Sequence, residues 1–311
     1  MNQDQNEEEV GYHRPVLADE VVELMAPVMP GVVVDATFGG GGHTRRMLDE
    51  FGADVTVVAI DRDPEALVNA AGLRATVIEG NFGDIDSLVP AVTDEPISGV
   101  LFDFGVSSHQ LDEGSRGFSY HQEGPLDMRM GPDARTSASD IVNRSTLDEL
   151  TRIIREYGEE PLARRIARAI VAARPIETTA TLSTVIADAM PAARRRAGHP
   201  ARRTFQAIRI AVNDELVAVA DGVDKAVDLV RSGGRVVAIS YHSLEDRIVK
   251  QRFNERARGC TCPPDLPVCG CGNTSEVRVL TRKPIRPGDV EVEDNKRARS
   301  AVLRAVEKVA S

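Results

Sequence analysis

The sequence predicts an α/β fold in which a parallel sheet, covered by helices, is interrupted by an all-helical segment. Short runs rich in β-branched residues lie at 32–35, 55–61, 75–78 and 100–103. Such apolar runs are typical of buried parallel strands, and the helix-compatible stretches between them supply the crossovers. Helical spacing then dominates from Ser139 to Val219, and strand-like runs return at 235–240 and 277–280. The helical segment is therefore predicted to lie between the fourth and fifth strands.

The first part of the chain is an acidic tail, then the four strands, then a long loop. Residues 1–10 carry four acidic side chains and are predicted to be disordered. Residues 105–132 are rich in Gly, Ser, Asp and Pro without hydrophobic periodicity. Loops of this length tend to be functional.

Four helices are predicted in the inserted segment. Ser145 to Asp148 reads as a capping box for a helix that ends at Gly158. The apolar spacing then predicts helices at 162–170 and 185–190, and one longer helix over 205–219.

Composition indicates a soluble globular protein and limits its partners. Apolar residues make up 42% of the 311 residues, and no apolar run approaches the ~20 residues of a membrane span. The acidic N-terminus lacks the basic residues of a signal peptide, so we expect a cytoplasmic protein. Aromatic residues are only 4%, which argues against a single-strand binder built mainly on stacking platforms.

Charge is unevenly distributed. The net charge is −10, yet residues 152–209 carry +7 and residues 247–311 carry +6. This segregation indicates either one basic face suited to nucleic acid or arginines that solvate amphipathic helices.

A glycine run follows the first strand and points to an adenosine cofactor. Gly39 to Gly42 would let the backbone approach a ligand at the carboxyl edge of the sheet. Asp61 ends the second strand, where an acidic side chain can accept hydrogen bonds from ribose hydroxyls. A dinucleotide fingerprint would need a third glycine where Thr44 stands, so a dehydrogenase is disfavoured. The pattern is that of S-adenosylmethionine-dependent methyltransferases, with Phe82 after the third strand as the adenine neighbour.

Several further motifs resemble one family closely, from about residue 11 to residue 305. They begin at His13, Asp103, Arg116, Gly124, Tyr157, Arg202 and Ser240, and the last reads Ser240-Tyr241-His242-Ser243-Leu244-Glu245-Asp246-Arg247. In these motifs the chain resembles the bacterial MraW family of small-subunit ribosomal RNA methyltransferases. The fourth-strand motif, Asp103-Phe104-Gly105-Val106, differs from the Pro-Pro motif of DNA amino methyltransferases, so the amine-gripping geometry of those enzymes does not transfer.

The resemblance implies a Rossmann-like S-adenosylmethionine-dependent methyltransferase sheet with an inserted all-helical domain. It implies methylation of the exocyclic N4 of a cytosine in the decoding centre of 16S ribosomal RNA, with the RNA expected to be within the small ribosomal subunit. The expected domains are residues 11–112 with 210–311 for the sheet and 113–209 for the insert. The expected cofactor-binding residues are Gly40, Gly41, Gly42, His43, Asp61, Phe82, Asp103 and Gln110.

Methyl transfer to an exocyclic amine needs a proton acceptor and no nucleophile from the enzyme. An exocyclic amine can take the methyl group directly if it is well positioned, without a cysteine adduct. Asp103 is the candidate to accept the amine proton, and the alternative is that Asp103 contacts only the cofactor. The candidates to hold the cytosine are Asn213, Glu215, Ser240, His242 and Ser243. A base inside folded RNA must be extruded, so the long loop and the insert are expected to clamp it.

Four cysteines form a tight group whose role the sequence leaves open. Cys260, Cys262, Cys269 and Cys271 would favour a metal over disulfides in a cytosolic protein. Only one residue separates each pair, whereas zinc ribbons have two to four. The alternatives to zinc binding are reduced structural thiols and an oxidation-prone loop.

Overall fold

The computed structural model describes residues 15–107, 110, 113–192, 199–259, 262, 270–271 and 273–310. Its described strands form one seven-stranded sheet in the order β3-β2-β1-β4-β5-β7-β6. The strands are β1 (Gly31–Asp35), β2 (Val55–Asp61), β3 (Ala75–Glu79), β4 (Ile97–Asp103), β5 (Val230–Ser240), β6 (Val277–Val279) and β7 (Val302–Lys308). The first five are parallel, and β7 pairs antiparallel with β5 and β6.

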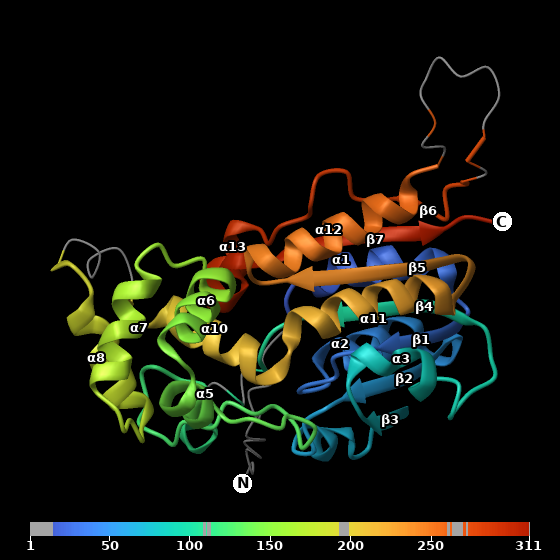
Figure 1. The fold of residues 1–311 in the computed structure, drawn as a ribbon. Coiled ribbons are helices and arrows are strands. Elements are labelled where there is room, and N and C mark those ends of the chain that lie inside the picture. The colour runs from blue at the N-terminus through green and yellow to red at the C-terminus, as the bar shows by residue number, and fades with distance from the viewer. Residues whose placement is uncertain are drawn as a thin grey trace, which may run out of the picture.

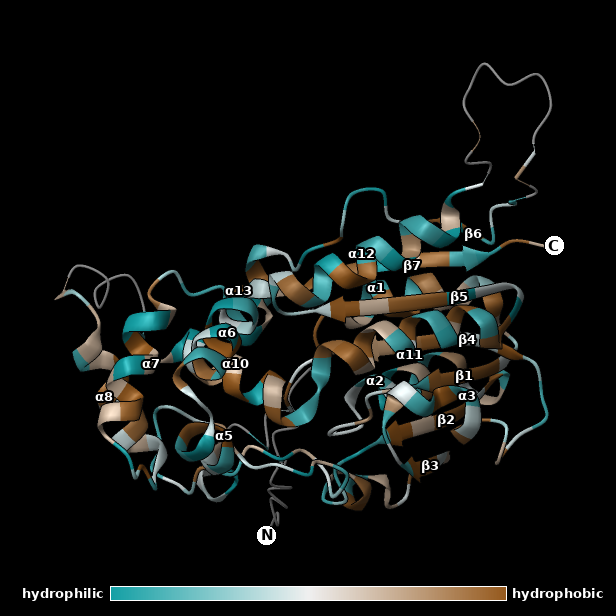
Figure 2. Ribbon diagram, viewed as in Figure 1, coloured by the Kyte–Doolittle hydropathy of each residue, from teal (hydrophilic) through white to brown (hydrophobic). Residues whose placement is uncertain are grey.

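Helices cover both faces of this sheet. Val32 and Val34 of β1 face a core shared with α3 (Ile85–Leu88), α11 (Glu215–Leu229) and α12 (Ser243–Ala257). Val33 faces the opposite core, shared with α1 (Ala18–Met25) and α2 (Gly42–Phe51). Successive side chains of a strand point to opposite faces, which is why a continuous apolar run is needed here. In Figure 2 the strands β1, β4 and β5 are largely brown, the colour of hydrophobic residues.

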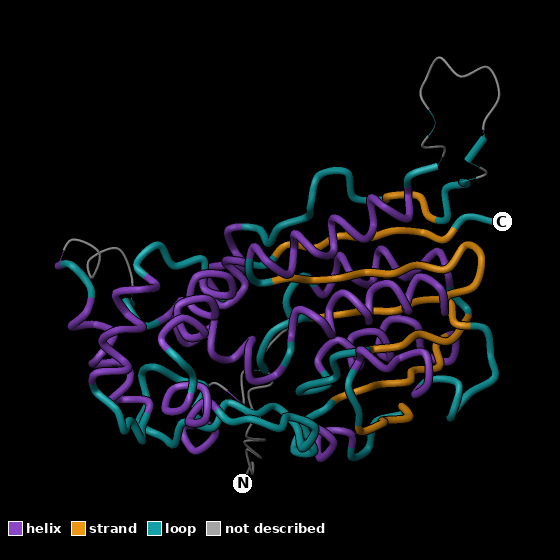
Figure 3. Tube along the Cα trace, viewed as in Figure 1, coloured by secondary structure: helices purple, strands orange, loops and turns teal. Residues whose placement is uncertain are grey.

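The inserted segment is helical and has its own core. Its helices are α5 (Ala138–Arg144), α6 (Leu147–Gly158), α7 (Ala163–Ala172), α8 (Thr179–Ala189) and α10 (Arg202–Asn213). Their buried side chains form a cluster from Phe118 to Val212. In Figures 1 and 3 these helices lie beside the sheet, joined to it through α10 and α11. The short helix α13 (Asp289–Asp294) precedes β7.

The predicted strands and the position of the insert are confirmed, but the single helix over 205–219 is wrong. Asp214 adopts the left-handed conformation, with φ 48° and ψ 35°, so α10 ends and α11 begins there. An Asp tolerates this conformation better than most residues, which lets the chain turn between the two helices.

Two smaller expectations also need correction, and one strand was missed. The capping box at the start of α6 uses Thr146 and Glu149 in place of Ser145 and Asp148. The predicted helix over 185–190 starts earlier, because the Thr178 side chain caps α8 at its N-terminus. Strand β7 was not predicted, since the buried Arg304 interrupts its apolar run; Asp246 neutralises that arginine at 2.6 Å.

No helix in the part of the chain that the structure describes is long and apolar enough to span a bilayer. The tail at 1–10 lies outside the described residues, and so do residues 193–198, which include three of the arginines of the +7 segment, Arg194, Arg195 and Arg196.

Candidate active site

The glycine run forms a tight turn between β1 and α2. Gly39 and Gly41 have positive φ values of 51° and 72°, which residues with a side chain rarely adopt. A Cβ atom on Gly41 would come within 2.9 Å of the Phe38 ring, whereas one on Gly40 would meet nothing within 4 Å. The turn is therefore crowded at Gly41 and open at Gly40, where a ligand could approach the backbone. We call the turn from Gly39 to Gly42 the glycine ledge.

Asp61 ends β2 directly beside this turn. Its two carboxylate oxygens accept the backbone N–H groups of Gly39 at 2.6 Å and Asp63 at 2.8 Å. Burial raises the pKa of Asp61 to about 6, although these hydrogen bonds act in the opposite direction. Each oxygen keeps a further lone pair, so the carboxylate can still accept from the hydroxyls of a ribose.

Asp35 and Thr44 lock the start of α2 onto the end of β1. The Thr44 hydroxyl donates to the Asp35 carboxylate at 2.6 Å. Burial raises the pKa of Asp35 above its usual value. Thr44 stands where a dinucleotide-binding protein would have glycine, and its hydroxyl joins α2 to the end of β1.

Asp103 lies at the carboxyl end of β4 between two potential donors. Tyr241 donates its hydroxyl to Oδ1 at 2.8 Å, and Nε2 of His43 lies 3.5 Å from Oδ2. The backbone N–H of Asp103 donates to the Thr37 hydroxyl at 2.6 Å, which fixes the strand end. Burial together with Asp103 raises the pKa of Tyr241 well above its usual value, so its proton stays in place. Sequence reasoning missed Tyr241, which lies 138 residues from Asp103 along the chain.

His43 is the most unusual side chain at this edge. It is only 6% exposed, and neither ring nitrogen has a hydrogen-bond partner among the described residues. Burial alone would lower its pKa, but the neighbouring Asp103 raises it above the usual value. A buried polar group without partners costs stability, which is why such groups mark sites that bind a polar ligand. We call Asp35, His43, Asp61 and Asp103 the edge cluster.

Two other predicted cofactor residues are engaged with the protein itself. Gln110 is buried, donates to Asp63 at 2.7 Å and accepts the Ser107 N–H at 3.1 Å. Phe82 is half-buried and packs edge-on against Phe102, with ring centroids 5.7 Å apart. Gln110 therefore positions the loop after β4, and Phe82 joins the core below the cofactor edge.

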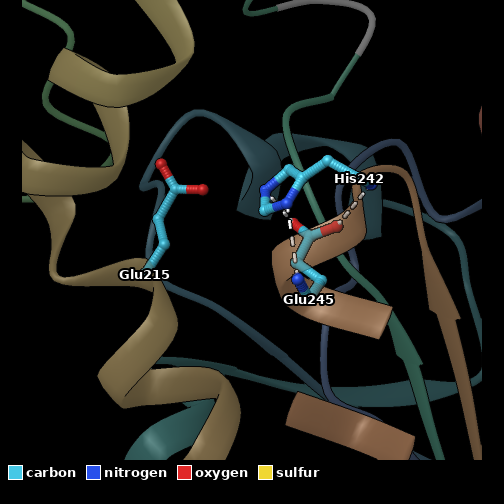
Figure 4. A group of neighbouring side chains, drawn as sticks. All are labelled: Glu215, His242 and Glu245. Atoms are coloured by element: carbon cyan, nitrogen blue, oxygen red, sulfur yellow. Dashed lines mark hydrogen bonds and ion pairs between the residues drawn. The ribbon is translucent and has the colours of Figure 1, made fainter. Parts of the chain in front are cut away.

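A second group of charges lies where the insert meets the sheet: Arg209, Glu215, His242 and Glu245. We call it the junction cluster. Arg209 of α10 donates to both Glu215 oxygens at 2.8 Å. Glu245 accepts the backbone N–H groups of Tyr241 and His242, and Nε2 of His242 lies 3.0 Å from its other oxygen. Figure 4 shows His242 and Glu245 facing one another across from Glu215.

The charges of the junction cluster balance one another. Burial alone would raise the pKa of Glu245, but His242 and Arg209 hold it below its usual value. Burial alone would lower the pKa of Arg209, but Glu215 raises it. Ligand atoms of Glu215, His242 and Glu245 lie within 4.8 Å of one another, as a metal site would require. Arg209 already donates to both oxygens of Glu215, which leaves this carboxylate engaged. We therefore interpret the cluster as a structural joint between the insert and the sheet, not as a metal site.

The junction also borders a cleft of about 300 Å³. It is lined by Gly158, Glu159, Arg202, Arg203, Gln206, Tyr241, His242 and Ser243. Two predicted base-holding residues, His242 and Ser243, thus lie in one cleft, and Tyr241 connects it to Asp103. The Ser243 hydroxyl donates to Glu159, which links the insert to α12.

The other predicted base-holding residues lie elsewhere. Asn213 is 2% exposed; its side chain donates to the carbonyls of Met128 and Arg209 and accepts the Met130 N–H, so it fastens the long loop to α10. Glu215 is held by Arg209, and Ser240 is buried in the last position of β5. These contacts favour structural roles for all three.

The cysteine prediction is untested. Cys260 and Cys269 lie outside the described residues, and Cys262 and Cys271 are half-buried.

Fold and site together define a Rossmann-like methyltransferase that uses S-adenosylmethionine. The glycine ledge, the Asp61 carboxylate and the unpartnered nitrogens of buried His43 fit this cofactor. Residues 11–309 match the MraW methylase family, and the chain belongs to that family.

Three relatives named ribosomal RNA small subunit methyltransferase H, each of nearly the same length, confirm the assignment. The chain is 48% identical to ribosomal RNA small subunit methyltransferase H of Heliobacterium modesticaldum, over 96% of this chain and 99% of that one. It is 50% identical to proteins of the same name from Symbiobacterium thermophilum and Geobacter sulfurreducens, over 96% of this chain and 97% and 99% of theirs. Among solved structures, an rRNA methylase from Streptococcus thermophilus aligns over 96% of this chain and 100% of that one, with 11% identity and a TM-score of 0.41.

Proposed function

We propose that this protein transfers a methyl group from S-adenosylmethionine to the exocyclic N4 of a cytosine in the decoding centre of 16S ribosomal RNA. The names of its close relatives support an RNA of the small ribosomal subunit as the substrate. The resemblance of its motifs to the MraW family supports the base and the atom. We further infer that the enzyme acts in the cytoplasm, on the small subunit.

The observation that carries the proposal is the placement of the Asp103 carboxylate. It stands half-buried at the sheet edge, next to the glycine ledge, and Tyr241 connects it to the cleft. An acceptor in this position can take a proton from an amine that enters through the cleft. An amine nitrogen needs only such an acceptor and correct positioning, because its lone pair forms the new bond to carbon without a covalent enzyme intermediate.

Asp61, His43 and Asp103 of the edge cluster each have a defined part in this scheme. When bound, S-adenosylmethionine supplies an electrophilic methyl group. Asp61 would hold the ribose, and Gly40, Gly41, Gly42 and His43 would face the methionine portion of the cofactor. Tyr241 donates to one oxygen of Asp103 and Nε2 of His43 lies 3.5 Å from the other, so that the carboxylate is oriented before the base arrives.

The cleft is the proposed entry for the target base. Its walls come from the insert on one side and from Tyr241, His242 and Ser243 on the other. A flipped base could therefore be held between residues 113–209 and the sheet domain, formed by residues 11–112 and 210–311. His242 and Ser243 are the proposed base contacts, whereas Asn213, Glu215 and Ser240 support the walls.

The test uses purified protein with methyl-labelled S-adenosylmethionine and small ribosomal subunits from a strain that lacks the enzyme. Nucleoside mass spectrometry should find the label in N4-methylcytidine from the subunits, and a parallel reaction with free 16S RNA identifies the preferred substrate. Label in 5-methylcytidine, or no label in either substrate, would contradict the proposal.

A further inference from the structure

Three rings gather on the surface of the insert, although the chain has few aromatic residues. They belong to Tyr120, His121 and His199, and we call them the ring cluster. Tyr120 and His199 are stacked with centroids 4.4 Å apart and an interplanar angle of 27°. His121 lies 4.4 Å from Tyr120 and 4.9 Å from His199. His121 is exposed, and the other two rings are half-buried.

The cluster is held firmly from below. The Tyr120 ring meets the buried Phe205 edge-on, with centroids 5.8 Å apart. Nδ1 of His199 accepts the backbone N–H of Ala201 at 3.3 Å. Burial, with the nearby His121, lowers the pKa of His199, so its ring is neutral at neutral pH. The rings therefore form a fixed surface before any ligand arrives.

The ring cluster adjoins the cleft through the first turn of α10. Arg202, Arg203 and Gln206 line the cleft, and Phe205 lies under Tyr120. At about 100° per residue, Arg202 and Phe205 are roughly 60° apart around the helix, so cleft and rings occupy adjoining faces. The exposed Arg202 stands between them, and its backbone N–H donates to the His199 carbonyl.

We propose that the ring cluster binds, by stacking, the unpaired nucleobase next to the target cytosine. Unpaired RNA bases stack on aromatic and histidine rings, and every base offers a flat face for this. With the target base in the cleft, the linking phosphate lies near Arg202, in a segment that carries +7 between residues 152 and 209. This inference rests on the proposed function and adds the neighbouring nucleotide to its substrate.

The test is the KM for unmethylated small subunits in three variants of the exposed His121. In His121→Ala and His121→Leu the KM should rise at least about fivefold, the lower end of the cost of one base–aromatic stack. His121→Phe should keep a KM near that of the parent, because a flat ring remains. Gln122→Ala, at the next exposed position, is the matched control and should change nothing. Thermal unfolding and S-adenosylmethionine affinity should be unchanged in all four.

The outcomes separate this inference from the proposed function. An unchanged KM in His121→Ala would overturn it and leave the rings as a fastening between the loop and α10. An equal loss in His121→Phe and His121→Ala would also overturn it, since stacking would not be the cause. Parent protein that methylates neither subunits nor free 16S RNA would instead contradict the proposed function.

Discussion

The edge cluster and the junction cluster are both buried groups of charges, but the pKa values of their buried carboxylates are shifted in opposite directions. In the junction cluster each carboxylate has a cation or backbone N–H partner, and burial fails to raise the pKa of Glu245. In the edge cluster burial prevails, so the pKa values of Asp35 and Asp61 are raised. Both His43 nitrogens lack hydrogen-bond partners among the described residues, whereas in the junction cluster Nε2 of His242 lacks one and Nδ1 accepts the Glu245 N–H. The protein's own ion pairs therefore offset burial in the junction cluster but not in the edge cluster, which is left to gain partners from a ligand.

The largest effect should come from removing the charge at Asp103. We expect Asp103→Asn to keep the shape of the side chain and to lower kcat by about 100- to 10,000-fold, the usual contribution of a proton acceptor. Cofactor affinity should fall far less. The measurement is single-turnover methylation of small subunits beside calorimetric titration with S-adenosylmethionine, and equal losses in both would demote Asp103 to a cofactor contact.

Breaking the junction cluster should cost stability without affecting the chemistry directly. Arg209→Met leaves the buried Glu215 and Glu245 without their guanidinium partner, so the free energy of unfolding should fall by about 3–5 kcal/mol. Denaturant titration measures this. Arg168→Ala, at an exposed position on α7, is the control and should stay within about 0.5 kcal/mol of the parent. A similarly small change in Arg209→Met would show that the cluster is not a structural joint.

Cofactor binding should depend on pH through Asp61. With a folded-state pKa of about 6, the carboxylate is ionised at pH 8 and mostly protonated at pH 5. Because ribose hydroxyls donate to the ionised form, affinity should rise through pH 6 and level off above it, by about tenfold between pH 5 and pH 7. The same raised pKa stabilises the folded protein below pH 4, and this contribution is lost as the pH rises through 6. Calorimetry from pH 5 to pH 8 tests the binding, and a flat profile would exclude ionised Asp61 as the ribose acceptor.

The sequence predicted what depends on local pattern. The apolar run of β2 was placed at its exact bounds, and the glycines and Asp61 were placed together, because parallel strands end at one edge of a sheet. The break at Asp214 was missed because apolar spacing continues from Phe205 to Val219 across it. β7 was missed because Arg304 depends on Asp246, 58 residues away, for its burial.

The candidate site was harder to predict wherever long-range partners decide a residue's role. Asn213 has the chemistry of a base contact, yet its amide is engaged by Met128 and Met130 of the long loop and by the Arg209 carbonyl. Tyr241 has no predicted role within the motif that begins at Ser240, yet its hydroxyl donates to Asp103. Neither partner lies near in sequence, so neither role leaves a local signal.

The comparison of the two clusters is tested most directly by one matched pair of variants, Asp61→Asn and Glu245→Gln, each measured for S-adenosylmethionine affinity and for unfolding. Both changes replace a buried carboxylate by an amide of the same size. Asp61→Asn should weaken cofactor binding at least about tenfold in a folded protein, because charge-assisted hydrogen bonds are lost. Glu245→Gln should lower the free energy of unfolding while the folded protein keeps its cofactor affinity. Unchanged binding in Asp61→Asn, or an equal loss of binding in Glu245→Gln, would contradict the account.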